Sequence, residues 1–173
     1  LSEAQNKAIS YGHADVDGEH LLLALLEQPE GLISRILSRT GADPSALAGR
    51  IEQDLTRRAR VTGPGVEPGK IRISPRLSRL LLKAEERADR LKDEYVSVEH
   101  LFPSFFDEGR TTAAGRILAE GGVTEEKFLA ALTEVRGRTR VCSDNPESTY
   151  EALEKYGRDL VAMARSGKLD PVI

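Results

Sequence analysis

The stretch VDGEHLLLALLEQPEG, residues 16–31, decides the fold, because it returns later in the chain as VSVEHLFPSFFDEG, residues 96–109. The Glu-His pair at 19–20 thereby recurs at 99–100. The match continues in both directions, with one inserted residue on the C-terminal side: Leu1, Ala4 and Ala8 match Leu81, Ala84 and Ala88, and Arg35, Ile36, Leu37 and Gly41 match Arg116, Ile117, Leu118 and Gly122. Self-similarity at a fixed offset is the signature of a repeat, so the sequence predicts two copies of one structural unit.

Each copy is predicted to form four helices, because apolar residues recur at helical spacing between capping residues. In the first copy, Asp17 caps the second helix and Gly31 precedes the third. Gly41 ends that helix, and Asp43–Pro44 opens the fourth. The matching caps of the second copy are Ser74 with Pro75, Ser97 and Thr124. The predicted fold class is all-α, with two pseudo-symmetric four-helix repeats that give eight helices in two bundles, followed by a linker and a short helical tail.

Composition marks the boundaries between these units. The segment between the copies is rich in Gly and Pro and is predicted to be a loop that ends in a short extended piece, and a polar stretch after about residue 136 is typical of a linker. Pro103 is expected to kink the second helix of its repeat, because proline lacks an amide hydrogen. Phe102, Phe105 and Phe106 are expected to fill the core around it. The predicted units are repeat 1 (1–57), the inter-repeat loop (58–73), repeat 2 (74–136), the linker (137–148) and the tail (149–173).

Charge and cysteine content restrict the classes of partner. The chain has 25 Lys and Arg against 28 Asp and Glu, a formal charge of −3, which offers no net field for holding a nucleic acid. Its one cysteine, Cys142, allows no intrachain disulfide and no multi-thiolate metal site. The longest apolar stretch is far shorter than the ~20 residues of a membrane span, and no export signal opens the chain. We therefore expect a cytoplasmic protein that binds neither nucleic acid nor membrane, and a fragment, because Leu1 falls within a predicted helix.

We find no catalytic constellation in the sequence. In GPGVEPGK, residues 63–70, Pro64 occupies the place where a phosphate-binding loop requires glycine. The three histidines lack the paired spacing of a metal site, and a structural role is expected for His20 and His100. Arginine clusters at 57–60 and 136–140 are expected to be solvated helix ends that complement the helix dipole. The sequence thus predicts no catalytic residue and no metal ligand.

Three carboxylates are candidates for a binding site. Glu19 and Glu99 stand in the first turn of equivalent helices, and Asp93 lies shortly before the second of them. One interpretation is helix capping, because a carboxylate is favourable at the positive end of the helix dipole. The other is a two-fold-related pair of carboxylates beside an apolar seam, which would orient a cationic or peptide ligand.

The repeats, with EHLLLALL and YVSVEH, and the tail TYEALEKYGRDLVAMARSGKLDPVI resemble the ClpB family of AAA+ protein disaggregases over nearly the whole chain. The double Clp-N repeat is shared with ClpA and ClpC relatives, whereas the tail is similar to the segment by which ClpB proteins enter their first ATPase module. Pro171, Val172 and Ile173 match the family's adenine-side segment, which is only part of a nucleotide pocket.

This resemblance implies a parent protein that is a homohexameric, ATP-driven chaperone using ATP and Mg²⁺. Such a chaperone threads aggregated polypeptides through its pore with the help of a DnaK-type system. The Walker motifs of the motor would lie beyond Ile173. The chain by itself is therefore expected to be a monomer without enzymatic activity or cofactor.

For the chain itself, the resemblance implies a domain that binds exposed apolar segments of unfolded or aggregated proteins in a groove between the repeats. Asp93 and Glu99 match acidic residues that contribute to this binding in the family. In ClpC relatives, glutamates that match Glu19 and Glu99 receive phosphorylated arginine. Two alternatives follow: an adaptor-docking or phosphoarginine-recognition domain, and a mobile spacer that tunes the motor.

Overall fold

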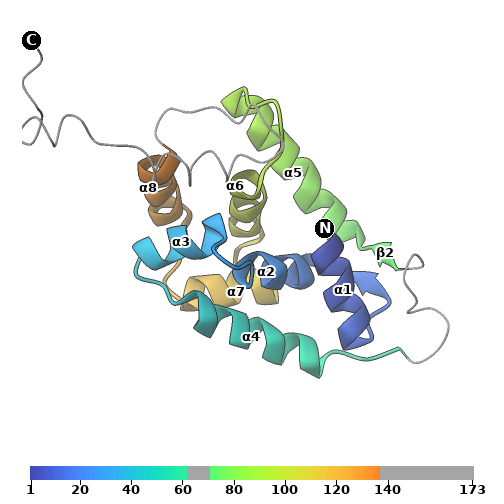
Figure 1. Ribbon diagram of the computed structural model, residues 1–173. Helices are drawn as coiled ribbons and strands as arrows, with labels where there is room; N and C mark the ends of the chain where they lie inside the picture. The colour runs from blue at the N-terminus through green and yellow to red at the C-terminus, as the bar shows by residue number, and fades with distance from the viewer. Residues whose placement is uncertain (62–70, 137–173) are drawn as a thin grey trace, which may run out of the picture.

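The computed structural model covers residues 1–173 and describes residues 1–61 and 71–136, which fold almost entirely into helices (Figure 1). The predicted linker and tail lie outside the described residues, and with them Cys142 and the nucleotide-side residues Pro171, Val172 and Ile173. Within the described part the all-α prediction is confirmed.

The elements follow the predicted order. The first repeat contributes α1 (Ser2–Tyr11), α2 (Gly18–Leu26), α3 (Leu32–Arg39) and α4 (Pro44–Arg57). The second contributes α5 (Pro75–Leu91), α6 (Val98–Leu101), a 3₁₀ segment η1 (Phe102–Thr111), α7 (Ala113–Glu120) and α8 (Glu125–Arg136). The strands β1 (Asp15–Val16) and β2 (Arg72–Ile73) pair in parallel. Strand β2 is the extended piece predicted at the end of the loop, whereas the sequence did not indicate β1.

Local sequence explains where the helices begin. The side chain of Asp43 accepts hydrogen bonds from the amides of Ser45 and Ala46, and Pro44 occupies the first helical position of α4. The hydroxyl of Ser74 likewise accepts from the Leu77 amide at the start of α5. Side-chain acceptors at these positions satisfy amides that have no partner inside the helix. The predicted caps of α4 and α5 are therefore confirmed.

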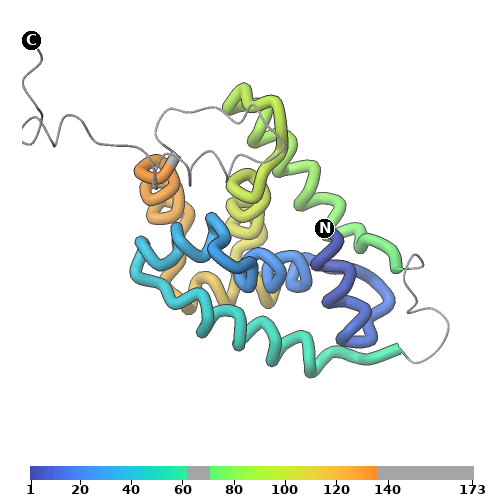
Figure 2. Tube along the Cα trace, in the orientation of Figure 1, coloured from blue at the N-terminus to red at the C-terminus, as the bar shows by residue number. Residues whose placement is uncertain are grey.

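The two repeats exchange their third helices. In the trace of Figure 2, α3 of the first repeat lies beside α8 of the second, and α7 of the second lies along α4 of the first. Helix α3 also contacts α6, and α7 also contacts α2. The expectation of two bundles is thus refined: the eight α-helices of residues 1–61 and 71–136 form two pseudo-symmetric repeats that are packed into one another.

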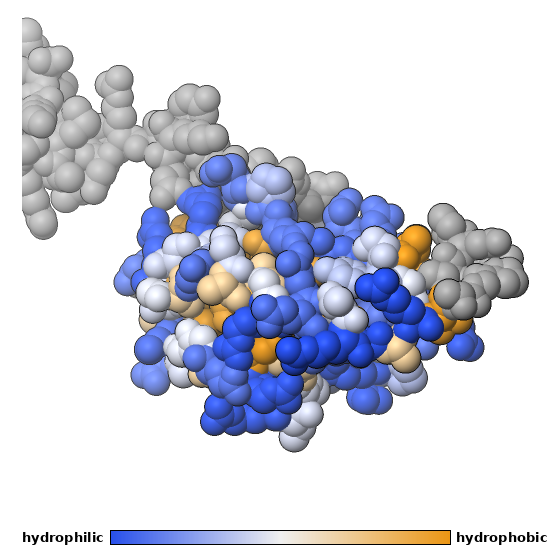
Figure 3. All heavy atoms as spheres, turned by 90° about the horizontal axis from the view of Figure 1, so that it is seen from below, coloured by the Kyte–Doolittle hydropathy of each residue, from blue (hydrophilic) through white to orange (hydrophobic). Residues whose placement is uncertain are grey.

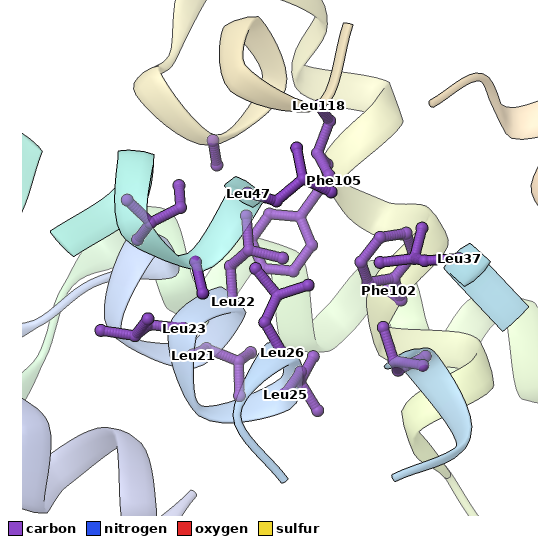
Figure 4. Close-up of a cluster of buried hydrophobic side chains, with 14 of the residues drawn as sticks. Leu21, Leu22, Leu23, Leu25, Leu26, Leu37, Leu47, Phe102, Phe105 and Leu118 are labelled. Atoms are coloured by element: carbon purple, nitrogen blue, oxygen red, sulfur yellow. The ribbon is translucent and has the colours of Figure 1, made fainter. Parts of the chain in front are cut away.

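One apolar core results from this exchange. Leu22 of α2, Phe105 of η1 and Leu118 of α7 are fully buried and lie together in Figure 4, although they come from both repeats. Next to them the rings of Phe102 and Phe128 stack with their centroids 4.6 Å apart. The phenylalanines around Pro103 therefore fill the core, as expected.

Pro103 ends the α-helical hydrogen bonding of the second repeat where the first repeat continues. Helix α2 runs to Leu26, whereas its counterpart α6 ends at Leu101 and the chain proceeds as η1. Proline has no amide hydrogen to donate to the preceding turn, and its ring crowds that turn. The kink predicted from the sequence is confirmed, and it takes the form of a change from α to 3₁₀ geometry.

The protein surface that surrounds this core is mainly polar. Hydrophilic side chains cover most of the face shown in Figure 3, with small apolar areas between them. Among the helices of residues 1–61 and 71–136, none is both long enough and apolar enough to cross a membrane.

Candidate functional site

Each repeat holds a histidine at the N-terminus of its second helix. The Nδ1 atom of His20 accepts a hydrogen bond from the Asp17 amide at 2.9 Å, and Nδ1 of His100 accepts from the Ser97 amide at the same distance. Asp17 and Ser97 are the N-cap residues of α2 and α6. Both histidines therefore close a capping box, which is the structural role that the sequence predicted.

The second ring nitrogen of each histidine faces a residue at the equivalent repeat position. Because Nδ1 accepts from the backbone, the ring proton lies on Nε2 and is donated. In the first repeat Nε2 of His20 lies 2.7 Å from Nδ1 of His13. In the second, Nε2 of His100 lies 2.9 Å from a carboxylate oxygen of Asp93. Position 13 and position 93 are thus one structural site occupied by two different side chains.

The two-histidine centre of the first repeat disfavours protonation. Burial lowers the pKa of His20 to about 4, and the neighbouring His13 and Arg58 act in the same direction. Burial, followed by the charges of Arg58 and Arg60, also lowers the pKa of His13. Both rings are therefore neutral at pH 7, as their mutual hydrogen bond requires.

Glu19 lies at the contact between the repeats and is fully buried. One carboxylate oxygen accepts from Arg76 at 2.6 Å and lies 2.8 Å from Arg58. The other accepts from the amide of Ala114, in the first turn of α7, at 3.1 Å. Burial opposes ionisation, but the hydrogen bonds and charges of Arg76 and Arg58 outweigh it and hold the pKa of Glu19 below its ordinary value. Glu19 thus caps a helix, as one interpretation proposed, but the helix belongs to the other repeat.

Arg76 extends this centre into a network across both repeats. Its guanidinium binds both carboxylate oxygens of Glu108 at 2.7 Å and one oxygen of Asp17 at 3.1 Å. Arg58 binds Asp54 through two nitrogens. The expectation that the arginines at 57–60 are a solvated helix end is therefore wrong for Arg58, because long-range partners draw it into the repeat contact.

Asp93 and Glu99 lie together in the second repeat. With His100 they form a buried group whose ligand atoms lie within 4.8 Å of one another. Such a donor set suits a metal ion in principle. Both ring nitrogens of His100 are already hydrogen bonded, to Ser97 and to Asp93, so we assign the group to the capping of α6. Asp93 is 8% exposed and Glu99 is 2% exposed.

An apolar groove lies between the repeats, at the meeting of α1, α2 and α6. It is a hollow of about 430 Å³. Its lining is Leu1, Glu3, Lys7, Leu21, Ala24, Leu25, Glu27, Gln28, Pro29, Val98 and Leu101. Leucine, alanine and valine side chains line much of it, and the ion pair of Lys7 and Glu27 adds charge. None of the three carboxylates singled out from the sequence is in the lining.

The capping group and the groove share one short helix. Val98 and Leu101 of α6 line the groove, while Glu99 and His100 belong to the buried capping group. The position of α6 therefore fixes one wall of the groove. The sequence did not indicate this groove wall, because its residues come from α1, α2 and α6, which belong to different repeats and come together only in the folded chain.

Comparisons with known proteins agree with the repeat architecture. The family model of the Clp repeat (R) N-terminal domain matches residues 1–121. The chaperone protein ClpB of Nitratidesulfovibrio vulgaris is 54% identical over 173 residues, which are 100% of this chain and 20% of that protein. ClpB of Bacillus cereus is 44% identical with the same coverage. The chain thus spans about one fifth of the length of these relatives.

Two solved structures share the fold. The Hsp104 N-terminal domain from Candida albicans has a TM-score of 0.69 at 21% identity, covering 82% of this chain and 89% of that one. A chain from a malarial protein secretion system has a TM-score of 0.65 at 28% identity, covering 78% and 87%. The family model matches more than half of this chain, so the chain belongs to the Clp repeat N-terminal domain family and is a relative of the ClpB chaperones.

Proposed function

We propose that this chain is the substrate-engaging N-terminal domain of a ClpB-like disaggregase. The apolar groove between α1, α2 and α6 is proposed to bind exposed apolar segments of unfolded or aggregated proteins. The observation on which this rests is the groove itself, an apolar hollow at the repeat contact of a chain whose full-length relatives are ClpB chaperones.

The size of the groove supports weak and promiscuous binding. Burying one leucine- or phenylalanine-sized side chain contributes about 1.5–3 kcal/mol, and dispersion and burial do not depend on a sequence motif. A dissociation constant of 1 mM corresponds to about 4 kcal/mol. A groove that accepts one or two such side chains is therefore expected to hold a segment briefly, and several linked domains would hold it longer.

The wider activity is proposed for a longer protein to which this chain belongs. By analogy with its ClpB relatives, that protein is proposed to be a cytoplasmic hexamer that hydrolyses ATP with Mg²⁺ and cooperates with a DnaK-type system. Pro171, Val172 and Ile173 are proposed as one side of its nucleotide pocket. The chain itself is proposed to act as a monomer without enzymatic activity.

A phosphoarginine-binding role finds less support in the geometry. It would use Glu19, but both carboxylate oxygens of Glu19 are already engaged, by Arg76 and Arg58 on one side and by the Ala114 amide on the other. An incoming guanidinium would have to displace these partners. The spacer role remains an outcome of the experiment below, whereas adaptor docking predicts saturable binding of a folded partner protein.

That experiment is an NMR titration of the chain with a permanently unfolded protein and, separately, with phosphoarginine. The proposal predicts amide shifts at the groove residues of α1, α2 and α6 from the unfolded protein, and none at these residues from phosphoarginine. Shifts only with phosphoarginine, centred on Glu19 and Glu99, would favour the recognition domain. No shift from either ligand at the groove residues, Glu19 or Glu99 would favour the spacer and would contradict the proposal.

Asp93 and Glu99 are proposed to support the groove by holding α6. The double variant Asp93→Asn, Glu99→Gln keeps the size of both side chains and removes two charges, so we expect weaker capture of an unfolded protein with unchanged helical circular dichroism. The control Glu85→Gln alters an exposed carboxylate of α5. Capture by the double variant as tight as by the control would remove both carboxylates from the proposed role.

A further inference from the structure

A second hollow lies away from the apolar groove, on the seam between α4 of the first repeat and α7 of the second. It measures about 210 Å³ and is lined by Arg50, Gln53, Asp54, Arg57, Arg116 and Ile117. The four residues from α4 have the spacing of one helix face. Figure 3 looks onto the side of the molecule where α4 lies, and hydrophilic side chains predominate there.

The charges around this hollow do not cancel. Arg57 and Arg116 are exposed, and neither has an ion-pair partner among residues 1–61 and 71–136. The one carboxylate in the lining, that of Asp54, is bound by two nitrogens of Arg58 at 3.0 and 2.8 Å. Arg50 pairs with Glu120. Two guanidinium groups therefore remain to attract an anion into the hollow.

The side chains that line the hollow and its volume indicate which kind of anion it binds. Guanidinium groups donate paired hydrogen bonds to the oxygens of phosphate and carboxylate groups. At roughly 30 Å³ for each water molecule, a volume of about 210 Å³ has room for about seven waters. That is enough for a phosphate group with part of its hydration shell, and the amide of Gln53 adds a further donor.

We propose that the hollow between α4 and α7 is a binding site for a small phosphate-bearing anion, with Arg57 and Arg116 as its main ligands. The two arginines come from different repeats, so the bound anion bridges them. Binding therefore stabilises the folded chain increasingly, and logarithmically, as the anion concentration rises. This site is independent of the apolar groove and of the role proposed for it.

The test is an NMR titration of the 173-residue chain with inorganic phosphate and with diphosphate at low ionic strength. We expect saturable shifts of amides near residues 50–57 and 116–117, with diphosphate binding more tightly because it offers oxygens to both arginines. Arg57→Gln and Arg116→Gln are each expected to weaken binding about tenfold or more. The control Arg79→Gln removes one exposed positive charge from α5 and is expected to leave binding unchanged.

Three results would overturn the proposal. The first is an absence of saturable shifts with either anion. The second is a set of shifts spread over the exposed arginines at large, which would show general counter-ion attraction. The third is an equal loss of affinity in Arg57→Gln and Arg79→Gln, because the two substitutions make the same change in net charge and differ only in their distance from the hollow.

Discussion

His20 and His100 show how one structural position accepts two electrostatic solutions. Both rings cap a helix through Nδ1, but His20 donates to a neutral histidine and His100 to a carboxylate. A second proton on His20 would have to enter at Nδ1 and would break the cap, and the neutral His13 offers no negative charge to offset it. The two capping boxes therefore share their hydrogen-bond geometry and differ in the charge of the acceptor that faces Nε2.

The first prediction concerns how the two-histidine centre of the first repeat responds to acid. The pKa of His20 in the folded chain, about 4, lies below the ordinary value of 6.5, so the unfolded chain takes up this proton first as the pH falls. The contribution of His20 is complete above pH 6.5 and declines toward pH 4, by on the order of 2 kcal/mol. The decline in the free energy of unfolding is measured by urea denaturation at pH 7 and at pH 4.5. In His13→Asp, which copies Asp93, the decline should shrink, and an equal decline in both proteins would contradict the assignment.

Arg76 provides the second prediction. It contacts the buried Glu19, both oxygens of Glu108, and Asp17, so Arg76→Met leaves carboxylates without their main cation at the repeat contact. Removing one partner of a buried ion pair costs about 3–5 kcal/mol. The control Arg79→Met changes an exposed residue of the same helix and should stay within about 0.5 kcal/mol of wild type. Similar urea midpoints for the two variants would show that the network contributes little.

At the scale of elements, the second repeat differs from the first at the end of its second helix. Pro103 stops α6 after four residues, and the following η1 contains Gly109, whose φ of 56° and ψ of −146° are open mainly to glycine. The turn returns the chain directly onto the start of α7, where Gly115 lies against the carbonyl oxygen of Gly109. This close approach is available only to a residue without a side chain.

The third prediction follows from that contact. A Cβ atom at position 115 would lie 1.8 Å from the Gly109 oxygen, so Gly115→Ala must displace backbone and should destabilise the chain by about 3 kcal/mol or more. Gly49→Ala is the matched control, since a Cβ there meets nothing within 4 Å and alanine in a helix should stabilise by about 0.5–1 kcal/mol. Thermal unfolding of the two variants should therefore shift in opposite directions. A shift in the same direction would contradict the described packing of η1 on α7.

At the scale of the whole molecule, the repeats are joined in a way that composition and periodicity do not reveal. The caps of Asp43 and Ser74 and the kink at Pro103 depend on nearby residues, and the sequence predicts them correctly. The partners of Glu19 are Arg58, Arg76 and Ala114, at separations of 39 to 95 residues, and only the folded chain brings them together. Local patterns thus identify the helices, while the exchange of third helices determines the site.

The contact between the two repeats explains why the groove could be expected but its walls could not. A groove between repeats follows from the resemblance to ClpB, but Ala24 and Val98 come from different repeats and meet through the position of α6. The three carboxylates singled out from the sequence lie buried beside this arrangement. The sequence indicates them because Glu19 and Glu99 recur at equivalent repeat positions and Asp93 lies shortly before one of them. Recurrence, however, identifies structural residues as readily as binding residues.

The central claim is that the apolar groove binds unfolded polypeptide, and one comparison tests it most directly. Ala24→Glu places a charge in the groove, and Leu82→Glu places the same charge on α5, where Leu82 is 58% exposed and outside the groove lining. The affinity of each variant for a labelled, permanently unfolded protein is measured by fluorescence anisotropy, with circular dichroism as the control for folding. We predict at least about tenfold weaker binding by Ala24→Glu and unchanged binding by Leu82→Glu, because a carboxylate in the groove must lose its hydration when an apolar segment binds. Equal binding by the two folded variants would contradict the account.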